Sequence, residues 1–518
     1  MVGTFWAFMP AIIAIVLALV TKQVYVSLFL GIFVGAMMYA GGDPLNAIFT
    51  LYQVMSEKVG ANTPIIVFLV VLGIFVVLMQ KSGGAKAYGE WAGNNIKSKN
   101  KALAATAGLG CLIFVDDYFN CLTVGSVMRP VTDKFKISRS KLAYIIDATA
   151  APVCIIAPIS SWAAAVAGEL EGDGLTVFIS TIPFNIYALL TIIMVFALCF
   201  LNFDFGKMKK NEDVAEATGD VYAGVPESGS AEAEIESNPK GKIRHLVVPV
   251  IILIICCIFG MIYTGFFYNW DTGLIDTELQ SANVIEAFSN CDAGMSLAIG
   301  STIALVIVSV YYMITKTISF KEITDSFTDG FKAMVPAILI LTFAWSIAGI
   351  MGAKGGYLDA QAFVETNLAN SAFPQFLFPA IFFILAGLIA FSTGTSWGTF
   401  GVLVPIAVTI LGGSGALTIM TVSATLGGAV FGDHISPISD TTILASAGAR
   451  CNHVEHVNTQ LPYAGLVAGI AAVAYLVGGA CTALGSVVSC IIMWAVALIL
   501  FAVAVFVIKT INKKKAAK

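Results

Sequence analysis

Two carboxylates and an imidazole stand together in the apolar second half of the chain, in the segment Phe431-Gly-Asp-His-Ile-Ser-Pro-Ile-Ser-Asp-Thr-Thr442. The residues on either side of this segment are almost all small or apolar. A carboxylate at membrane depth is costly unless it is solvated, paired or neutralised, so such residues usually mark the path of an ion or a substrate. Asp433, Ser436 and Asp440 also fall at i, i+3 and i+7, which places them on one stripe of a helix. The segment therefore predicts a binding site inside a membrane helix.

Pro437 interrupts that stripe. Its nitrogen cannot donate to the carbonyl of Asp433 and its ring would clash with it, so a helix should break or kink here. A released carbonyl beside carboxylates and hydroxyls can form an oxygen cage for a hard cation such as sodium. We therefore predict a sodium site built from Asp433, Ser436 and Asp440, with Thr441 also in the ion- or substrate-binding set.

The histidines of this region have different expected roles. His434 belongs to the predicted binding set, where an imidazole suits proton transfer or pH sensing, or simply orients the neighbouring Asp433; both interpretations stay open. His453 and His456 follow Arg450 in a predicted cytoplasmic loop, where we expect solvated side chains.

The composition predicts a membrane protein. Hydrophobic residues make up 58% of the 518 residues and charged residues 12%, whereas a soluble domain carries about a quarter charged residues. The net charge of −4 suggests no nucleic-acid partner, and the ten cysteines show no zinc-type spacing. We predict an all-α polytopic membrane protein of about eleven or twelve helices plus hairpins, because most charge-poor runs reach the ~20 residues that cross a bilayer. These runs are Phe5–Val20, Val24–Ala40, Thr63–Gln80, Leu175–Leu201, Leu246–Tyr268, Met295–Ile314, Ala333–Met351, Pro374–Phe391, Ala464–Leu484 and Val487–Ile508.

Charge placement predicts the topology and the division of the chain. Basic loops and the basic tail Lys513–Lys515 should be cytoplasmic by the positive-inside rule, which leaves the acidic segments Gly168–Gly174 and Asp271–Asp292 outside. Segment 211–238 is rich in Glu, Ala and Ser and predicts a disordered cytoplasmic linker. The expected units are a first transmembrane repeat (1–201), the linker (202–243), and a second transmembrane repeat with a C-terminal helix and basic tail (244–518).

Two segments are expected to form hairpins. Ala102–Pro130 lies between two basic loops, which predicts a re-entrant hairpin or two half-helices, and Pro374–Leu411 should turn back at Ser392-Thr-Gly-Thr-Ser-Trp-Gly398. Short segments of the two halves also align with each other when the numbering is shifted by one constant amount. Asp147-Ala-Thr149 then aligns with Ser423-Ala-Thr425, Ile159-Ser160 with Ile435-Ser436, and Gly125 with Gly401. Together these features predict two inverted-topology repeats with broken helices, an architecture of secondary transporters.

The first half supplies the remaining binding candidates. Phe114-Val-Asp-Asp-Tyr-Phe-Asn120 carries adjacent carboxylates at the predicted hairpin tip, and Asp147-Ala-Thr-Ala-Ala-Pro152 places a carboxylate in a second broken span. Hydroxyls in such spans can equally be helix caps, whereas buried aspartates favour a binding role. The ion- or substrate-binding candidates from this half are Asp116, Asp117, Asn120, Asp147, Thr149 and Ser160.

These segments, with Gly432-Asp-His-Ile-Ser-Pro-Ile-Ser-Asp-Thr-Thr442 and its continuation His453-Val-Glu-His-Val-Asn-Thr-Gln-Leu-Pro-Tyr463, resemble the NhaC family of sodium/proton antiporters. The similarity runs through nearly the whole chain apart from the linker. The resemblance implies an electrochemically coupled carrier of the wider ion-transporter superfamily, with paired repeats, a homodimer and an elevator-like shift. It does not define the substrate, since relatives include carriers similar to malate/lactate antiporters and sodium-coupled amino-acid carriers.

We therefore expect a secondary active transporter that exchanges sodium for protons across the cytoplasmic membrane. The alternative is a sodium- or proton-coupled carrier of a small organic solute. The expected partners are sodium, protons, membrane lipid and, in the alternative, that solute; no cofactor is expected beyond the sodium ion. An enzyme or ATP-driven pump is disfavoured, since the chain has no HExxH motif and no Gly-x-x-x-x-Gly-Lys-Ser/Thr loop. A channel would need a continuous pore and a selectivity ring, usually built by symmetric subunits.

Overall fold

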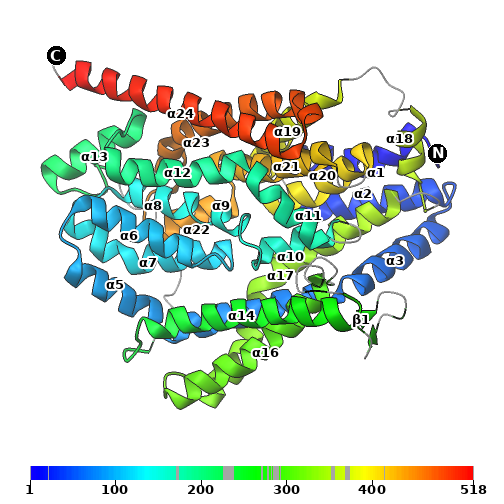
Figure 1. Ribbon diagram of the computed structural model, residues 1–518, viewed down its shortest axis with the longest axis horizontal. Coiled ribbons are helices and arrows are strands. Elements are labelled where there is room, and N and C mark those ends of the chain that lie inside the picture. The colour runs from blue at the N-terminus through cyan, green and yellow to red at the C-terminus, as the bar shows by residue number, and fades with distance from the viewer. Residues whose placement is uncertain are drawn as a thin grey trace.

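The computed structural model is built almost entirely of helices (Figure 1). It describes residues 2–21, 23–170, 174–225, 238–269, 272, 274–276, 279–281, 283, 287, 291, 293–351, 356–367, 374–412 and 415–516. The first half contains η1 (Phe5–Phe8), α1 (Met9–Thr21), α2 (Val24–Tyr39), α3 (Pro44–Ala61), α4 (Thr63–Lys81), α5 (Gly84–Asn95), α6 (Lys99–Leu112), α7 (Asp117–Lys134), α8 (Arg139–Ala148), α9 (Ala151–Cys154), α10 (Ser161–Gly168), α11 (Gly174–Thr181), η2 (Ile182–Phe184) and α12 (Ile186–Leu201).

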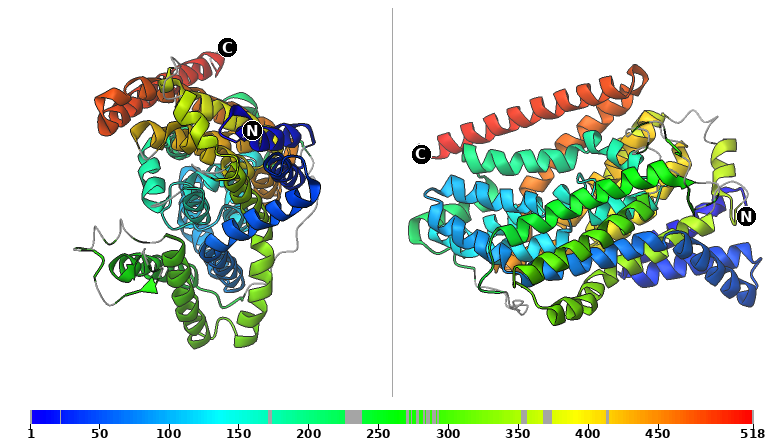
Figure 2. Two further views of the ribbon diagram at one scale, coloured as in Figure 1. Left: turned by 90° about the vertical axis from the view of Figure 1, so that its right-hand side faces the viewer. Right: turned by 60° about the horizontal axis from the view of Figure 1, so that its bottom comes forward.

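The rest of the chain adds more helices and one short β-hairpin. These elements are α13 (Gly206–Thr218), α14 (Arg244–Phe267), β1 (Tyr268–Asn269), β2 (Leu274–Ile275), α16 (Ala293–Ile314), α17 (Phe320–Met351), α18 (Ala360–Asn367), η3 (Gln375–Leu377), α19 (Phe378–Thr393), α20 (Ser396–Leu411), α21 (Ala416–Ile435), α22 (Asp440–Ala449), α23 (His453–Ala480), η4 (Thr482–Leu484) and α24 (Ser486–Ala516). The two strands pair antiparallel. Figures 1 and 2 show α14 and α16 on one side of the molecule and α24 on the opposite side, with the broken helices between them.

The helix lengths confirm a polytopic membrane protein. Within the described residues, eight helices are long and apolar enough to cross a membrane, or up to ten if each bent pair is one span. This is fewer than the eleven or twelve predicted, partly because the run Phe5–Val20 forms only a shorter apolar helix. The run Leu175–Leu201 is divided into α11, η2 and α12, and only α12 belongs to a helix of spanning length. Pro183 lies in the intervening turn, and the side chain of Asn185 starts α12 by accepting a hydrogen bond from the backbone nitrogen of Ala188.

Both predicted hairpins are pairs of helices with a break at the predicted position. Helices α6 and α7 pack on each other around the break at residues 113–116. Helices α19 and α20 join at Gly394, whose φ of +71° suits glycine, and at Thr395, whose side chain caps α20. The residues Gly394-Thr-Ser-Trp-Gly398 match the Gly-x-Ser-x-Gly pattern of serine hydrolases, but they form this helix–helix turn instead of a strand-to-helix elbow.

The linker is more ordered than predicted. Residues 206–218 form α13, which packs on α8 and α23. Glu212 accepts a hydrogen bond from the backbone nitrogen of Ser138 at 2.7 Å, and Lys207 pairs with Glu455 at 2.5 Å. Burial acts to lower the pKa of Lys99, but the carboxylates of Glu212 and Glu216 outweigh it and raise that pKa. The prediction of disorder is therefore wrong for residues 211–218, and residues 226–237 lie outside the described part of the chain.

Helix α8 occupies the centre of the packing. All ten of its residues are buried, including the charged Arg139, Lys141 and Asp147. Lys141 is neutralised by Asp204 at 2.5 Å, and Arg139 by Asp133 at 2.8 Å, both near the end of the helix where the basic residues lie. Asp147 lies at the other end, so α8 carries one carboxylate into the interior.

Helices α7 and α22 approach each other through two glycines. A Cβ atom added at Gly125 would lie 2.4 Å from the carbonyl carbon of Gly448, and one added at Gly448 would lie 2.5 Å from the carbonyl oxygen of Cys121. The obstacle in both cases is backbone, so it cannot move aside as a flexible side chain would. The contact therefore sets the spacing between a helix of the first half and a helix of the second half.

We expect Gly448→Ala to lower the midpoint of thermal unfolding of the purified protein by several degrees. The added methyl must push α22 away from α7, and overpacking of this kind costs about 1–3 kcal/mol. Gly465→Ala in α23 is the matched control, because a Cβ atom there meets nothing within 4 Å. Equal midpoints for the two variants would show that the contact is not tight.

Candidate functional site

The predicted break at Pro437 is present, and it separates α21 from α22. Asp433 lies in the last turn of α21 and is fully buried. Its carboxylate accepts hydrogen bonds from the hydroxyls of Ser439 at 2.7 Å and Thr441 at 2.5 Å, both contributed by the start of α22. The carbonyl oxygen of Asp433, which we expected to be released, instead accepts the backbone nitrogen of Ser436 at 3.1 Å.

Ser436 is not directed at the Asp433 carboxylate. Its hydroxyl donates to the carbonyl oxygen of Phe391 in α19 at 2.7 Å, so it ties the break to the neighbouring hairpin. The hydroxyl that takes the expected place is that of Ser439, which the sequence analysis did not select. The sequence did contain a sign of this role. Ser439 lies within the same motif and directly precedes Asp440, where a serine often caps a helix, as it caps α22 here.

Asp440 joins the two halves of the chain. It is the first residue of α22, and its carboxylate accepts a hydrogen bond from the hydroxyl of Tyr118 in α7 at 2.5 Å. Asp117, the first residue of α7, is fully buried and accepts a hydrogen bond from the indole nitrogen of Trp162 at 3.0 Å. Asp116 lies beside it in the break between α6 and α7 and is 2% exposed. Tyr118, which directly follows these two carboxylates, thus links the break of the first half to the motif of the second half.

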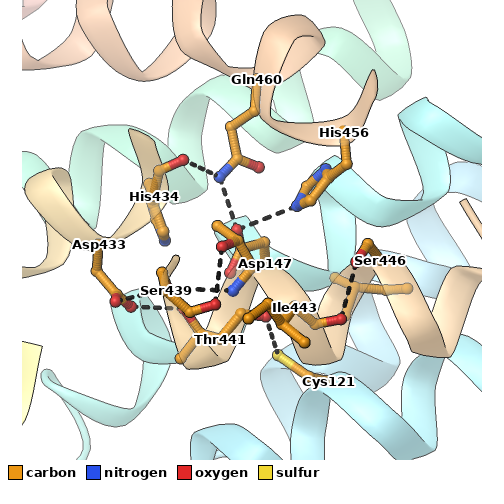
Figure 3. Close-up of polar contacts among 12 residues, drawn as sticks. Cys121, Asp147, Asp433, His434, Ser439, Thr441, Ile443, Ser446, His456 and Gln460 are labelled. Atoms are coloured by element: carbon orange, nitrogen blue, oxygen red, sulfur yellow. Dashed lines mark hydrogen bonds and ion pairs between the residues drawn. The ribbon is translucent and has the colours of Figure 1, made fainter. Parts of the chain in front are cut away.

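A second cluster surrounds Asp147, and Figure 3 shows Gln460 and His456 reaching it from α23. One carboxylate oxygen accepts a hydrogen bond from Gln460 at 2.6 Å and lies 3.3 Å from Nε2 of His456. The same amide of Gln460 donates to the carbonyl oxygen of His434 at 2.7 Å. One side chain thus connects α8, α21 and α23.

This cluster corrects two expectations about histidine. His456 is fully buried at Asp147, so the expectation of a solvated loop residue is wrong for it. The chain is already helical at His453, and one face of the first turns of α23, which includes His456 and Gln460, is buried. Nδ1 of His434 lies 2.9 Å from the hydroxyl of Tyr187 in α12, so its ring contact is with that tyrosine and not with Asp433. Gln460 was also missed, although it follows His456 at i+4 on the same helix.

The other predicted residues of the first half act locally as caps or clamps. Asn120 donates from its amide nitrogen to the carbonyl oxygens of Gly110, Ile113 and Thr149, at 2.7 to 3.0 Å. The hydroxyl of Thr149 bonds back to the carbonyl of Ile145 at 2.7 Å. Ser160 caps α10 by accepting from the backbone nitrogen of Ala163 at 3.1 Å. These groups stabilise the breaks that position the aspartates.

The aspartates lie in one electrostatic neighbourhood. The charge of Asp440 acts on both Asp433 and Asp117, and the charge of Asp147 acts on Asp433. In the described part of the chain, no lysine or arginine pairs with any of the four aspartates Asp117, Asp147, Asp433 and Asp440. A buried group of carboxylates without lysine or arginine partners is suited to holding a cation or protons. The described residues contain no group of three His, Cys, Asp or Glu side chains that could hold a metal ion, so a cation here would depend on hydroxyl and carbonyl oxygens as well.

The chain is similar to several known proteins. An uncharacterized protein of Haemophilus influenzae is 38% identical over 496 residues, which cover 92% of this chain and 91% of that protein. The malate-2H(+)/Na(+)-lactate antiporter of Bacillus subtilis is 31% identical over 147 residues, 28% of this chain and 30% of that protein. The crystal structure of the YdaH transporter of Alcanivorax borkumensis superposes with a TM-score of 0.43 at 15% identity, covering 85% of this chain and 89% of that one.

The family itself is identified by its sequence profile, which matches residues 171–480 and therefore includes the broken helix with Asp433 and Asp440. Together with the multi-pass helical fold and the relative that aligns over most of its length, this match shows that the chain is a secondary transporter, and that it belongs to the Na+/H+ antiporter family.

Proposed function

We propose that this transporter exchanges sodium for protons across the cytoplasmic membrane. The observation that carries the proposal is the meeting of aspartates from both halves of the chain without a lysine or arginine partner. Such a site gains stability from any small cation that enters it, and each carboxylate can bind either a proton or part of the coordination shell of sodium.

Sodium would bind at the break between α21 and α22. The carboxylates of Asp433 and Asp440 provide the charge, and the hydroxyls of Ser439 and Thr441 already lie within hydrogen-bond distance of Asp433. In this structure both hydroxyls donate hydrogen bonds to the carboxylate of Asp433. To coordinate sodium, each hydroxyl oxygen would have to direct a lone pair at the ion. Ser436 would contribute only if its hydroxyl left the carbonyl of Phe391. The predicted ligand set would therefore require a local rearrangement at that residue.

Competition between the two ions is sufficient to couple their movements. A carrier that changes its open face only when its carboxylates hold sodium or protons must exchange one for the other. The broken helices in both halves, at 113–116 and 149–160 and again at 394–395 and 436–439, support such a carrier because broken helices commonly build the binding sites of transporters. We further propose an inverted repeat, a homodimer in the cell membrane, and a cytoplasmic C-terminus, for which the basic tail and the family resemblance are the support.

Transport of a small organic solute is the second candidate. It is favoured by the similarity to the malate/lactate antiporter, which covers 28% of the chain. Indole and phenol groups also border the aspartates, at Trp162 and Tyr118, and these could contact an organic ligand. Uptake of labelled malate, lactate and amino acids into sodium-loaded vesicles would distinguish the two candidates.

We expect Asp433→Asn and Asp440→Asn each to reduce sodium-driven proton movement in proteoliposomes roughly tenfold or more. The amide keeps the shape of the side chain but loses the charge, and a bond to a charged group contributes about 1.5–3 kcal/mol. Asp325→Asn, at an exposed position on α17, is the control. Both site variants should remain folded and monodisperse; full transport in both of them would rule out this binding site.

We expect Gln460→Leu to lower both the thermal midpoint and the transport rate. It removes the donor shared by Asp147 and the carbonyl of His434. Asp147 keeps its contact with His456, but the carbonyl loses this donor, and a buried acceptor left without a partner costs about 1–3 kcal/mol. Gln375→Leu, at an exposed position, should change neither quantity. An unchanged midpoint for Gln460→Leu would show that Asp147 does not depend on this amide.

A further inference from the structure

A further carboxylate lies in the interior, away from the site described above. Glu169 directly follows α10 and is only 8% exposed. It belongs to the acidic segment Gly168–Gly174, which is predicted to lie outside the membrane, but its side chain is covered by the surrounding helices. Neither of its carboxylate oxygens has a hydrogen-bond partner in the described part of the chain. A buried carboxylate without a partner is costly, so its position calls for a ligand.

The surroundings of Glu169 contain hydrogen-bond donors that also have no partner. A Cβ atom added at Gly401 of α20 would lie 3.5 Å from Oε1 of Glu169. A Cβ atom added at the preceding residue, Gly168, would lie 3.2 Å from the indole nitrogen of Trp345 in α17. That indole N–H lacks an acceptor, although the side chain is only 2% exposed. An unpartnered acid and an unpartnered donor thus lie at adjacent positions between α10, α17 and α20.

Two more buried polar groups without partners lie in the first turn of α20. The hydroxyl of Ser396 and the indole nitrogen of Trp397 are buried, and neither has a partner in the described residues. Trp397 precedes Gly401 by one helical turn, so it lies on the face of α20 that meets Glu169. Buried polar groups that lack protein partners are usually bridged by ordered water. This interface therefore has the polar lining that a short file of water needs.

Trp162 connects this interface to the aspartates. It precedes Glu169 by seven positions, so the two side chains share a stripe of α10. Its indole nitrogen donates to Asp117, and its ring centroid lies 5.7 Å from that of Trp397 and 5.0 Å from that of Phe400. The stripe thus runs from the carboxylate of Asp117, past these rings, to the carboxylate of Glu169.

We infer that Glu169 is a second proton-binding site, from which a proton reaches Asp117 through water held by Ser396 and the indoles of Trp345 and Trp397. The step moves one proton from the Glu169 carboxyl group to the Asp117 carboxylate as sodium leaves, and no other bond changes. The tight packing beside Glu169 suits a proton and not a larger ligand. A Cβ atom added at Gly401 would lie only 2.8 Å from the Cβ atom of Ala344. Lys58 of α3 is the charged group that acts on Glu169, and it would stabilise the carboxylate after the proton has left.

This inference rests on the proposed sodium/proton exchange, so the test separates proton movement from sodium movement. Glu169→Gln is reconstituted in vesicles and compared with the wild type and with Glu90→Gln, a control at an exposed position. We expect sodium-driven proton movement, read by a pH dye, to fall roughly tenfold, the ratio that corresponds to about 1.4 kcal/mol. Exchange of labelled sodium against unlabelled sodium, which needs no proton, should stay within about twofold of the wild type.

Other outcomes would overturn the inference. Loss of both exchanges in a folded Glu169→Gln protein would assign the residue to sodium binding or to packing, and retention of both would remove it from the proton path. Absence of proton movement in the wild type would contradict the proposed function itself, whatever the variant does. As a measurement independent of transport, the tryptophan fluorescence of the purified protein should titrate with pH in the wild type and in Glu169→Asp, and the pH profile should change in Glu169→Gln, where only Asp117 still titrates beside the indoles. An identical titration in all three proteins would also contradict the inference.

Discussion

Negative charge in an apolar interior is the constraint on which the rest of this structure depends. A carboxylate removed from water must be hydrogen-bonded, paired with a cation or protonated. This chain carries several aspartates into its helical centre, and four of them have no lysine or arginine partner in the described residues. The break between α21 and α22 brings two hydroxyls to Asp433, and the break before α7 brings the phenol of Tyr118 to Asp440.

The donors come from distant parts of the chain, and this makes the site depend on the packing of the two halves. Asp433 takes hydroxyls from its own motif, whereas Asp440 depends on Tyr118 of α7 and Asp147 on Gln460 of α23. A relative movement of the halves would exchange these partners or release them. Occupation of the carboxylates by sodium or by protons would then decide which arrangement is stable, which is the property that an exchanger requires.

Local chemistry made part of this structure predictable from the sequence. Proline and glycine often end helices. The structure has a break at Pro437 and another at Gly394, within the run Ser392–Gly398. The partners of Asp440 and Asp147 were not predictable, because Tyr118 and Gln460 lie 322 and 313 residues away along the chain. His456 was expected in a solvated loop after Arg450, yet the packing of α23 turns its side chain inward, and the side chain of Glu169 is also buried although it lies in a turn after α10. The residues of α13 were misjudged for a similar reason, since their charged groups find partners such as Ser138 and Glu455 only in the folded protein.

The central claim is that sodium and protons bind to the same aspartates. It is tested most directly by calorimetric titration of the purified protein with sodium in two buffers that differ in ionisation enthalpy. If the carboxylates are shared, sodium binding releases protons to the buffer, so the heat of binding should differ between the two buffers. That difference should disappear in the double variant Asp433→Asn, Asp440→Asn. Sodium binding by the wild type with the same heat in both buffers, at every pH at which the protein stays folded, would contradict the account.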